Sequence, residues 1–558
     1  MKRKVGEKMN KMKKITAILI ILALCFAVAA CGGDGETTSS GGTTNSGGTT
    51  SSGGTSSSGS GSGDNVLVPG DVISAPEEDN VEYADLIDII LQSIFTVIDP
   101  LNPAATNPGF RFMYICLYDR LVYRTNEGEF VGELATSWET DDLQHYTFHL
   151  REGVVFHNGE NFTAQSVIDT ITTARENPGS LAFDAWRSVD TITAVNDYTL
   201  DIVLTAPNVD FIFQMSIPGA SIISRAERAI DPVAGAWVGT GAYYMEDFVP
   251  GDYALLTRND NYWGAPIPTR QLLFRFVPEF GTRAVYLQNG QSHICTGLST
   301  ADIDMFVDDP NFIVYRIPSD PHPIAFNMND PITGDLNFRL AVAHALNMDE
   351  ITIVAAGNYG SPSTDGTFWG YSTEFRNTAV PLLEYNVDLA REYLEASSYN
   401  GEEVEIMTGV ETTQRAAEII QEQLGRIGIR ITLLHTDSPT LSAAAVYGNT
   451  QTQLVSHPSP FSLSASSARP MFYPGGASNR ASYNNPAVTE LFDLAPTIGD
   501  PAQRESIYKE IQELISADLP YLNIFYRVQA IVTTSNIGGI ITNADQNHDF
   551  RGIFMVVD

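Results

Sequence analysis

The chain has 558 residues, of which 43% are apolar, and it carries 67 acidic against 32 basic side chains, a formal net charge of −35 at pH 7. A protein this acidic repels phosphate backbones and anionic headgroups, which excludes nucleic-acid binding. The length and the apolar content are sufficient for two or three hydrophobic cores, so we expect several domains.

The first 30 residues have the three-part layout of a secretion signal. Seven basic residues between Lys2 and Lys14 precede the uncharged run Ile15 to Ala30, which ends at Cys31. This run is shorter than the roughly 20 residues of a spanning helix, so a permanent anchor helix is the weaker alternative. The ending Val28-Ala-Ala-Cys31 resembles the lipobox of bacterial lipoproteins, in which the cysteine receives a diacylglyceryl group. We predict lipidation at Cys31 and attachment to the outer face of the cytoplasmic membrane by lipid alone.

Residues 31–76 follow as a lipidated linker. From Thr37 to Gly63 every residue is Gly, Ser or Thr except Asn45. Such a segment cannot repay the entropy of ordering its backbone, which predicts a flexible tether with an r.m.s. reach of about 30 Å.

Two cysteines remain for the folded body, Cys116 and Cys295, and neither lies in a C-x-x-C pattern. A single disulfide and two buried free thiols are both compatible with the sequence.

Helices and strands alternate along the body, which is typical of an α/β protein. In the first half, a strand is expected over Tyr146 to Arg151 with a continuation over Gly153 to Phe156, followed by a helix capped by Thr163. In the second half we expect helices that begin at Asp335, at Asp388, at Thr412 or Thr413 and at Asp500, and strands over Ile429 to Leu434 and Tyr521 to Tyr526.

Several short motifs occur in the order in which one protein family has them. They are Glu133 to Glu139, Tyr146 to Gly159, Gly239 to Tyr243, Pro250 to Asp252, Arg258 to Gly264, Ala325 to Met328, Arg339 with Ala341 and Ala345, and Met348 to Ile351. Fainter matches are Ala390 to Leu394, Gln423 to Ile429 and Tyr483 to Pro486. Together they resemble the family 5 extracellular solute-binding proteins of oligopeptide, dipeptide and nickel type, which are lipoprotein partners of ABC importers.

The resemblance implies an α/β, two-lobed periplasmic-binding-protein-like fold with a hinge and an inserted domain. We expect a signal peptide over residues 1–30, a first lobe over 77–117, 236–320 and 527–558, an inserted domain over 118–235 and a second lobe over 321–526. The expected ligand is a peptide or another small solute, the expected partners are ABC permease subunits, and we expect a monomer without cofactor.

The resemblance also directs attention to loops that face the cleft. A peptide is held through its backbone and through roomy aromatic pockets. Candidate ligand-binding residues are Phe95, Thr96, Trp369, Tyr371, Tyr447, Ser456, His457 and Phe472, and ordinary packing is the alternative for each aromatic ring.

One position departs from the family pattern. Peptide binders of this family often place an aspartate shortly before a proline in the second lobe, where it pairs with the amino terminus of the peptide. Ser456 stands at that position here, and a hydroxyl cannot replace the charge. Either the amino terminus is not recognised through an ion pair or another acid, such as Asp437, takes the role.

The sequence offers little support for catalysis. His145 and His149 are four residues apart in an expected strand, without a third ligand at zinc-site spacing, so packed or surface histidines are the preferred interpretation. No H-E-x-x-H, no P-loop and, in the folded body, no G-x-S-x-G motif is found. An extracellular peptide receptor or chaperone-like binder without import is the second hypothesis, and a lipid-tethered hydrolase is the third.

Overall fold

The structure is a computed structural model. It describes residues 66–67, 73–74, 82–102, 111–125, 128–178, 180–231, 233–370, 373–409, 411–436, 440–441, 444, 450–454, 464–476, 478–542 and 548–557. The chain divides into two units, Met1–Gly61 and Ser62–Asp558, and the description below concerns the second. The leader, Cys31 and most of the linker lie outside the described residues.

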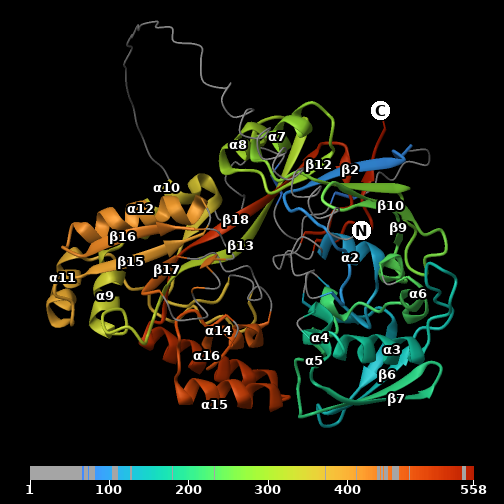
Figure 1. Cartoon of the computed structure of the whole chain (residues 1–558), viewed down its shortest axis with the longest axis horizontal. Coiled ribbons are helices and arrows are strands. Elements are labelled where there is room, and N and C mark those ends of the chain that lie inside the picture. The colour runs from blue at the N-terminus through green and yellow to red at the C-terminus, as the bar shows by residue number, and fades with distance from the viewer. Residues whose placement is uncertain are drawn as a thin grey trace, which may run out of the picture. The chain divides into compact units, whose positions relative to one another are not determined.

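A sheet of twelve strands runs through the described part of this unit, with two long antiparallel strands at its centre (Figure 1). These strands are β13 (Phe312–Phe326) and β18 (Tyr521–Thr534). On one side the sheet continues with β12 (Ile294–Thr296), β2 (Leu86–Leu91), β11 (Gln271–Phe276), β10 (Tyr253–Arg258) and β9 (Tyr243–Val249). On the other it continues with β17 (Thr452–Leu454), β15 (Glu403–Thr408) and β16 (Arg430–His435). The short strands β1 (Val66–Leu67) and β14 (Gly360–Pro362) pair with β13 and β18.

We call the part built on β2 and β9–β12 the first lobe. Strand β2 is parallel to both β11 and β12, and five of its six residues are buried. A parallel strand covered on both faces needs such a continuous apolar run, which Leu86-Ile-Asp-Ile-Ile-Leu91 supplies apart from Asp88. Helices α7 (Phe280–Gln288) and α8 (Thr300–Val307) contribute Ala284, Leu287, Ile303 and Phe306 to the core against this region.

We call the part built on β15–β17 the second lobe. Its helices are α9 (Leu336–Ala345), α10 (Met348–Ala356), α11 (Val387–Ala396), α12 (Glu411–Gly425), α14 (Arg469–Phe472), α15 (Pro486–Leu494) and α16 (Pro501–Asp518). They form two hydrophobic clusters, one around Ile406 and Ile420 and one around Phe472 and Tyr508. The crossover from β15 through α12 to the parallel strand β16 is the α/β unit that the sequence predicts.

A separate antiparallel sheet has the order β5 (Ala135–Glu139), β6 (His145–Leu150), β8 (Thr199–Leu204) and β7 (Val189–Asn196), and we call the part built on it the inserted domain. The helices of this domain are α3 (Ala164–Arg175), α4 (Leu181–Trp186), α5 (Phe211–Gln214) and α6 (Arg225–Ile230). The hairpin of β3 (Val122–Arg124) and β4 (Phe130–Gly132) precedes the sheet.

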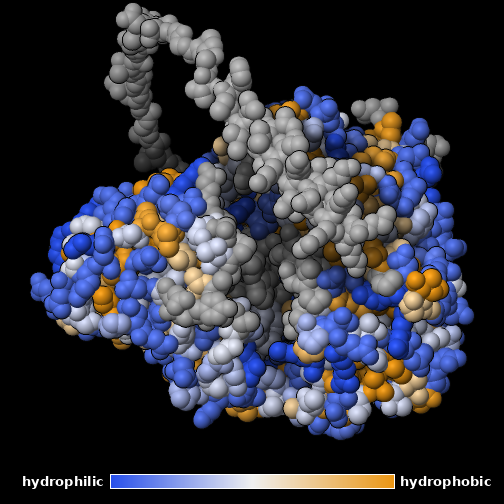
Figure 2. Space-filling view, viewed as in Figure 1, coloured by the Kyte–Doolittle hydropathy of each residue, from blue (hydrophilic) through white to orange (hydrophobic). Residues whose placement is uncertain are grey.

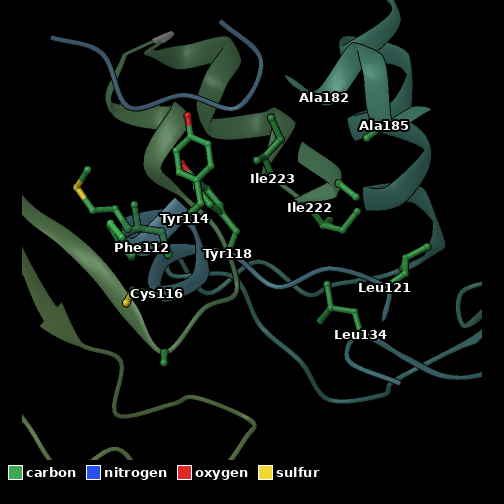
Figure 3. Close-up of a cluster of buried hydrophobic side chains, with 14 of the residues drawn as sticks. Phe112, Tyr114, Cys116, Tyr118, Leu121, Leu134, Ala182, Ala185, Ile222 and Ile223 are labelled. Atoms are coloured by element: carbon green, nitrogen blue, oxygen red, sulfur yellow. The ribbon is translucent and has the colours of Figure 1, made fainter. Parts of the chain in front are cut away.

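The inserted domain and the first lobe share one hydrophobic core. This cluster contains Ile89 and Phe274 of the first lobe together with Tyr146 and Trp186 of the inserted domain. Figure 3 shows its centre, where α2 (Arg111–Leu117) directs Phe112, Tyr114 and Cys116 into the core. The same view includes Leu121, Leu134, Ala182, Ala185, Ile222 and Ile223. No comparable apolar cluster among the described residues joins the inserted domain to the second lobe.

Most local predictions are confirmed. Thr163, Asp335 and Asp500 are the N-caps of α3, α9 and α16, and the carboxylates of the two aspartates accept backbone hydrogen bonds as a cap requires. Strand β16 begins one residue later than expected, and β18 continues beyond Tyr526 to Thr534.

Three local predictions are wrong. The cap of α11 is Asn386, whose side chain accepts from the Leu389 N–H at 3.0 Å, and Asp388 lies in the first helical turn. Helix α12 already includes Thr412 and Thr413, since it begins at Glu411. Residues 153–156 do not continue β6, because Gly153 adopts φ +78° and the chain folds into a turn closed by the bridge between Val155 and Asn161.

Candidate functional site

Strands β13 and β18 connect the two lobes, and their pairing is irregular at the crossing. The register shifts between Pro318 and Pro321 and again between His322 and Pro323. Proline has no N–H to donate to the ladder, so the hydrogen bonding is interrupted where the chain passes between the lobes. A broken ladder bends more easily than a regular one, which makes this segment the candidate pivot for relative motion of the lobes.

The surface is hollowed between the second lobe around α14 and α16 and the inserted domain around α4 and α5, as Figure 2 shows in the orientation of Figure 1. Ligand sites lie preferentially in hollows between separately packed parts of a protein, which makes this hollow the candidate site.

Trp369 and Phe472 lie in the core of the second lobe. Their rings stack with centroids 5.8 Å apart and an interplanar angle of 9°, and both side chains are fully buried. Tyr521 packs edge-on against Phe472 at 5.4 Å. In this structure the two residues form an aromatic support behind the surface, and a direct contact of either with a solute stays a prediction.

Hydrogen bonds from the side chains of Arg376 and Tyr526 hold the loop that carries Trp369. The Arg376 guanidinium donates to an oxygen of Asp365 and to the carbonyl oxygen of Trp369, both at 2.7 Å. The hydroxyl of Tyr526, on β18, donates to the same carbonyl at 2.9 Å. Because Tyr526 pairs with Pro321 at the crossing of the two long strands, this loop is tied to the region where the lobes connect.

Phe95 and Thr96 differ in their exposure. The Phe95 ring is buried edge-on against Phe276, with centroids 4.9 Å apart, and its carbonyl accepts from the Gly251 N–H at 2.7 Å. Thr96 is exposed. Of this pair, only the threonine hydroxyl is presented to solvent.

The remaining ligand candidates are Tyr371, Tyr447, Ser456 and His457, and they lie outside the described residues, as does Asp437. The substitution of a hydroxyl for the expected aspartate therefore stays a prediction from the sequence.

Four buried charged side chains and the partly buried Arg551 lie where the inserted domain meets the first lobe. They are Asp119, Arg120, Glu133, Asp549 and Arg551, and we call them the buried charge cluster. Sequence reasoning did not single out this cluster as a group, because its members come from three distant segments and have no common spacing. Of these five residues, only Glu133 stands in a motif that the sequence analysis identifies, as the first residue of Glu133 to Glu139.

The cluster is densely hydrogen-bonded. Arg120 Nε lies 2.9 Å from Glu133 Oε2, while Arg551 reaches Glu133 Oε1 at 2.9 Å and Asp549 Oδ2 at 2.6 Å. The Trp263 indole N–H and the Thr240 hydroxyl both donate to Asp119 Oδ2, at 2.8 and 2.9 Å. Charges that are this well paired tolerate burial.

The acids of the cluster divide into two kinds. Burial raises the pKa of Asp119 to about 7, and repulsion from Glu133 adds to the rise. Arg120 and Arg551 hold the pKa of Glu133 below its usual value in spite of burial. Arg551 does the same for the pKa of Asp549. With two guanidinium groups facing three carboxyls, a proton on Asp119 leaves the cluster neutral.

His145 and His149 lie on β6 as exposed side chains. His145 Nδ1 is 2.7 Å from Asp142 Oδ2, and His149 Nε2 is 3.9 Å from Glu139 Oε1. The described residues contain no group of three or more His, Cys, Asp or Glu side chains placed to hold a metal ion.

Cys116 and Cys295 are both buried free thiols, so of the two alternatives the sequence leaves open, the structure has the unpaired one. Burial raises the pKa of each thiol. Among the described helices, none has the length and apolar character that crossing a membrane requires.

The sequence matches a family described as bacterial extracellular solute-binding proteins, family 5 middle, over residues 129–479. A nickel-binding periplasmic protein of Escherichia coli (strain K12) is 23% identical over 480 residues, which cover 79% of this chain and 90% of the relative. A glutathione-binding protein of Pectobacterium atrosepticum is 26% identical over 476 residues, 80% of this chain and 89% of the relative.

Solved structures share the fold. The periplasmic binding protein DppA of Helicobacter pylori, in complex with the peptide STSA, superposes with a TM-score of 0.73 at 22% identity and covers 85% of this chain and 99% of its own. NikA of Brucella suis, in complex with Fe(III)-EDTA, gives a TM-score of 0.74 at 22% identity, with 85% and 100% covered.

Proposed function

This chain belongs to family 5 of the bacterial extracellular solute-binding proteins, and from that premise we propose that it captures a peptide between its lobes and delivers it to an ABC permease. The observation that carries the proposal is the broken pairing of β13 and β18 between two lobes whose main cores are separate. Such a connection lets the lobes close on a ligand by hinge motion, and capture of this kind needs no covalent step.

We propose the boundaries of the parts as well. The first lobe comprises residues 77–117, 236–320 and 527–558, the inserted domain 118–235 and the second lobe 321–526. The register shifts of β13 at Pro318–Pro321 support the change of lobe near residue 320.

A peptide is supported by two lines of reasoning. Relatives of this chain include a glutathione-binding protein, and glutathione is itself a tripeptide; the similar fold of DppA holds the peptide STSA. The aromatic support formed by Trp369 and Phe472, with Tyr521 packed against it, is a backing of the kind on which side-chain pockets are built. The relative that binds nickel makes a metal complex the competing ligand class for the test.

Membrane attachment through a lipid on Cys31 is part of the proposal. Two or more acyl chains on one residue give stable anchoring, and the Gly/Ser/Thr linker after it would keep the body clear of the bilayer. Replacing Cys31 with Ala should release the body into the medium or leave an unprocessed precursor. Unchanged size and membrane retention of that variant would contradict lipidation.

The ligand class is tested by native mass spectrometry of the purified protein, followed by thermal unfolding with the co-purified compound and with a peptide library. A ligand that binds only the folded state raises the melting temperature according to RT ln(1 + [L]/Kd). Stabilisation by peptides supports the proposal, whereas stabilisation by nickel complexes alone would replace the peptide with a metal chelate.

The serine at position 456 leads to a finer test. A neutral hydroxyl forms no ion pair with an ammonium group. N-acetylation of a binding peptide should therefore weaken its binding free energy by far less than the roughly 3 to 5 kcal/mol of a broken buried ion pair. Calorimetric titration of the free and acetylated forms measures the difference. A loss of about a hundredfold, or 2.7 kcal/mol, would mean that another acid, such as Asp437, holds the amino terminus.

A further inference from the structure

The inserted domain touches the second lobe directly, at the end of the hollow away from β13 and β18. In Figure 1 the contact lies where α5 meets the end of α15, at the bottom of the view. The Val209 N–H donates to the Pro496 carbonyl at 2.9 Å, a hydrogen bond between residues almost 300 positions apart. Close by, Leu143 of the inserted domain approaches Gly499 of the second lobe. Its Cδ1 lies 3.6 Å from the point that a Cβ would occupy if position 499 carried a side chain.

Charges of opposite sign face each other across this contact. Arg504, on α16 of the second lobe, has one guanidinium nitrogen 3.7 Å from Asp210 Oδ1 of the inserted domain and another 3.6 Å from Glu374 Oε1 of its own lobe. We call Asp210, Glu374 and Arg504 the Arg504 cluster. Burial raises the pKa of Glu374, and the charges of Arg504 and of Arg124 from the inserted domain oppose that rise. Each side thus presents an acid and a base to the other.

Two of the three side chains are shielded from water, whereas Glu374 is 36% exposed, and the cluster is incompletely bonded. The side chains of Asp210 and Arg504 are only 10% and 12% exposed, and a hydrogen bond from Ser466 of the second lobe also reaches Asp210. The two ion pairs are nevertheless longer than hydrogen bonds, and Arg504 Nε is buried without a hydrogen-bond partner among the described residues. Pairs of this kind contribute attraction without the rigidity of a bidentate contact.

We propose that the Arg504 cluster is a latch that holds the inserted domain on the second lobe and opens when solute enters or leaves. The latch rests on the proposed capture by hinge closure and adds to it a specific contact on the side opposite the hinge. Opening exposes the charges of Arg504 and Asp210 to solvent, where salt ions screen them, so added salt favours the open latch.

Hydrogen exchange of the Val209 amide reports on the latch in the full chain without any solute. We compare the wild type with Arg504→Gln at low salt, by mass spectrometry with fragmentation that resolves this amide. The variant should exchange Val209 about threefold faster, and exchange of the wild type should accelerate with added salt. The matched control is Arg426→Gln, which removes an exposed ion pair to Glu422 on α12 of the same lobe and should leave Val209 unchanged.

Two outcomes would overturn the proposal. One is an unchanged Val209 rate in Arg504→Gln. The other is equal acceleration at Ile202, a buried residue of β8, because that would mean general opening of the inserted domain. Exchange of the two charges, Asp210→Arg with Arg504→Asp, should restore protection of Val209 if attraction is the cause, provided that Glu374→Gln removes the second acid beside position 504. Since no solute is used, a failed latch leaves the binding proposal standing, and absence of peptide binding leaves the latch result standing.

Discussion

The inserted domain uses buried charges at both of its borders, but the two borders differ. Toward the first lobe, Arg551 forms two ion pairs of the buried charge cluster across the border, to Glu133 at 2.9 Å and to Asp119 at 3.6 Å, and the surrounding side chains belong to one continuous core. Toward the second lobe, the Arg504 cluster provides one ion pair across the border, Arg504 to Asp210 at 3.7 Å, beside the backbone hydrogen bond of Val209. The first border has the character of a domain interior and the second that of a separable interface.

This difference shows which parts move together. A fully paired charge cluster inside a shared core cannot open without exposing apolar surface and unpaired charge, and both are costly. A contact made of one long ion pair and one backbone hydrogen bond can open into water, where both charges are solvated again. The inserted domain is therefore expected to move with the first lobe and to part from the second.

The largest expected effect comes from removing Arg551. In Arg551→Met, Asp549, Glu133 and Asp119 lose their shared cation while they remain buried, which should lower the free energy of unfolding by about 3 to 5 kcal/mol. Urea denaturation followed by tyrosine fluorescence measures this. A loss below about 1 kcal/mol, the size typical of exposed pairs, would mean that the first border is as separable as the second.

Asp119 should give that border a characteristic pH dependence. Its pKa is raised from 3.8 to about 7, so its contribution to stability is fully present below pH 4 and is lost as the pH rises through 7. Relative to Asp119→Asn, the wild type should lose about 2 kcal/mol between pH 5 and pH 7. Denaturation of both proteins across this range checks the sign, and a constant difference would contradict the buried, protonated carboxyl.

His157 links the inserted domain to the first lobe. Its contribution to stability should depend on pH in the direction opposite to that of Asp119. Its Nδ1 accepts from the Gly239 N–H at 3.3 Å, and its Nε2 lies 3.1 Å from the Gly241 carbonyl, an arrangement that suits a neutral ring. Burial lowers the pKa of His157 to about 4, so its contribution is present above pH 6.5 and is lost as the pH falls toward 4. The wild type should lose about 1.5 kcal/mol relative to His157→Gln between pH 6.5 and pH 5, and parallel denaturation profiles would show that the ring is already exposed.

The smallest effect on stability is expected at the second border. Arg504→Gln should cost less than about 1 kcal/mol, because the contact can open and let water solvate Asp210. The same urea titration serves for this variant and for Arg551→Met. A cost as large as that of Arg551→Met would place the inserted domain in equally firm contact with both lobes.

The sequence predicts the fold well where the signal is local or where many motifs add up. Asp335 and Asp500 mark helix starts correctly, because a carboxylate at an N-cap has its partner three or fewer residues away. Asn386 was missed in favour of Asp388, because two capping residues two positions apart are equally good candidates on the sequence. Strand β13 was not predicted, since Pro318, Pro321 and Pro323 argue against a strand unless the partner strand tolerates register shifts.

The candidate site is less accessible to sequence reasoning. The buried charge cluster joins residues from Asp119 to Arg551, and the latch joins Val209 to Pro496, so neither has a spacing that a local pattern can reveal. Aromatic residues in loops are ambiguous for another reason. Trp369 and Phe472 lie in loop-like or short helical segments and yet pack in a core, because a large ring is buried wherever the chain folds over it.

The central claim, that the inserted domain moves with the first lobe and apart from the second, is tested most directly by spin-label distances in the full chain with Cys25 and Cys31 replaced by serine. Cys116 and Cys295 are buried, so labels attach to introduced cysteines at exposed positions. One pair joins Val195 of the inserted domain to Met305 on α8, and the other joins Val195 to Leu494 on α15. The account predicts that Arg504→Gln leaves the first distance distribution unchanged and lengthens or broadens the second. A change in the first distance with the second preserved would contradict it.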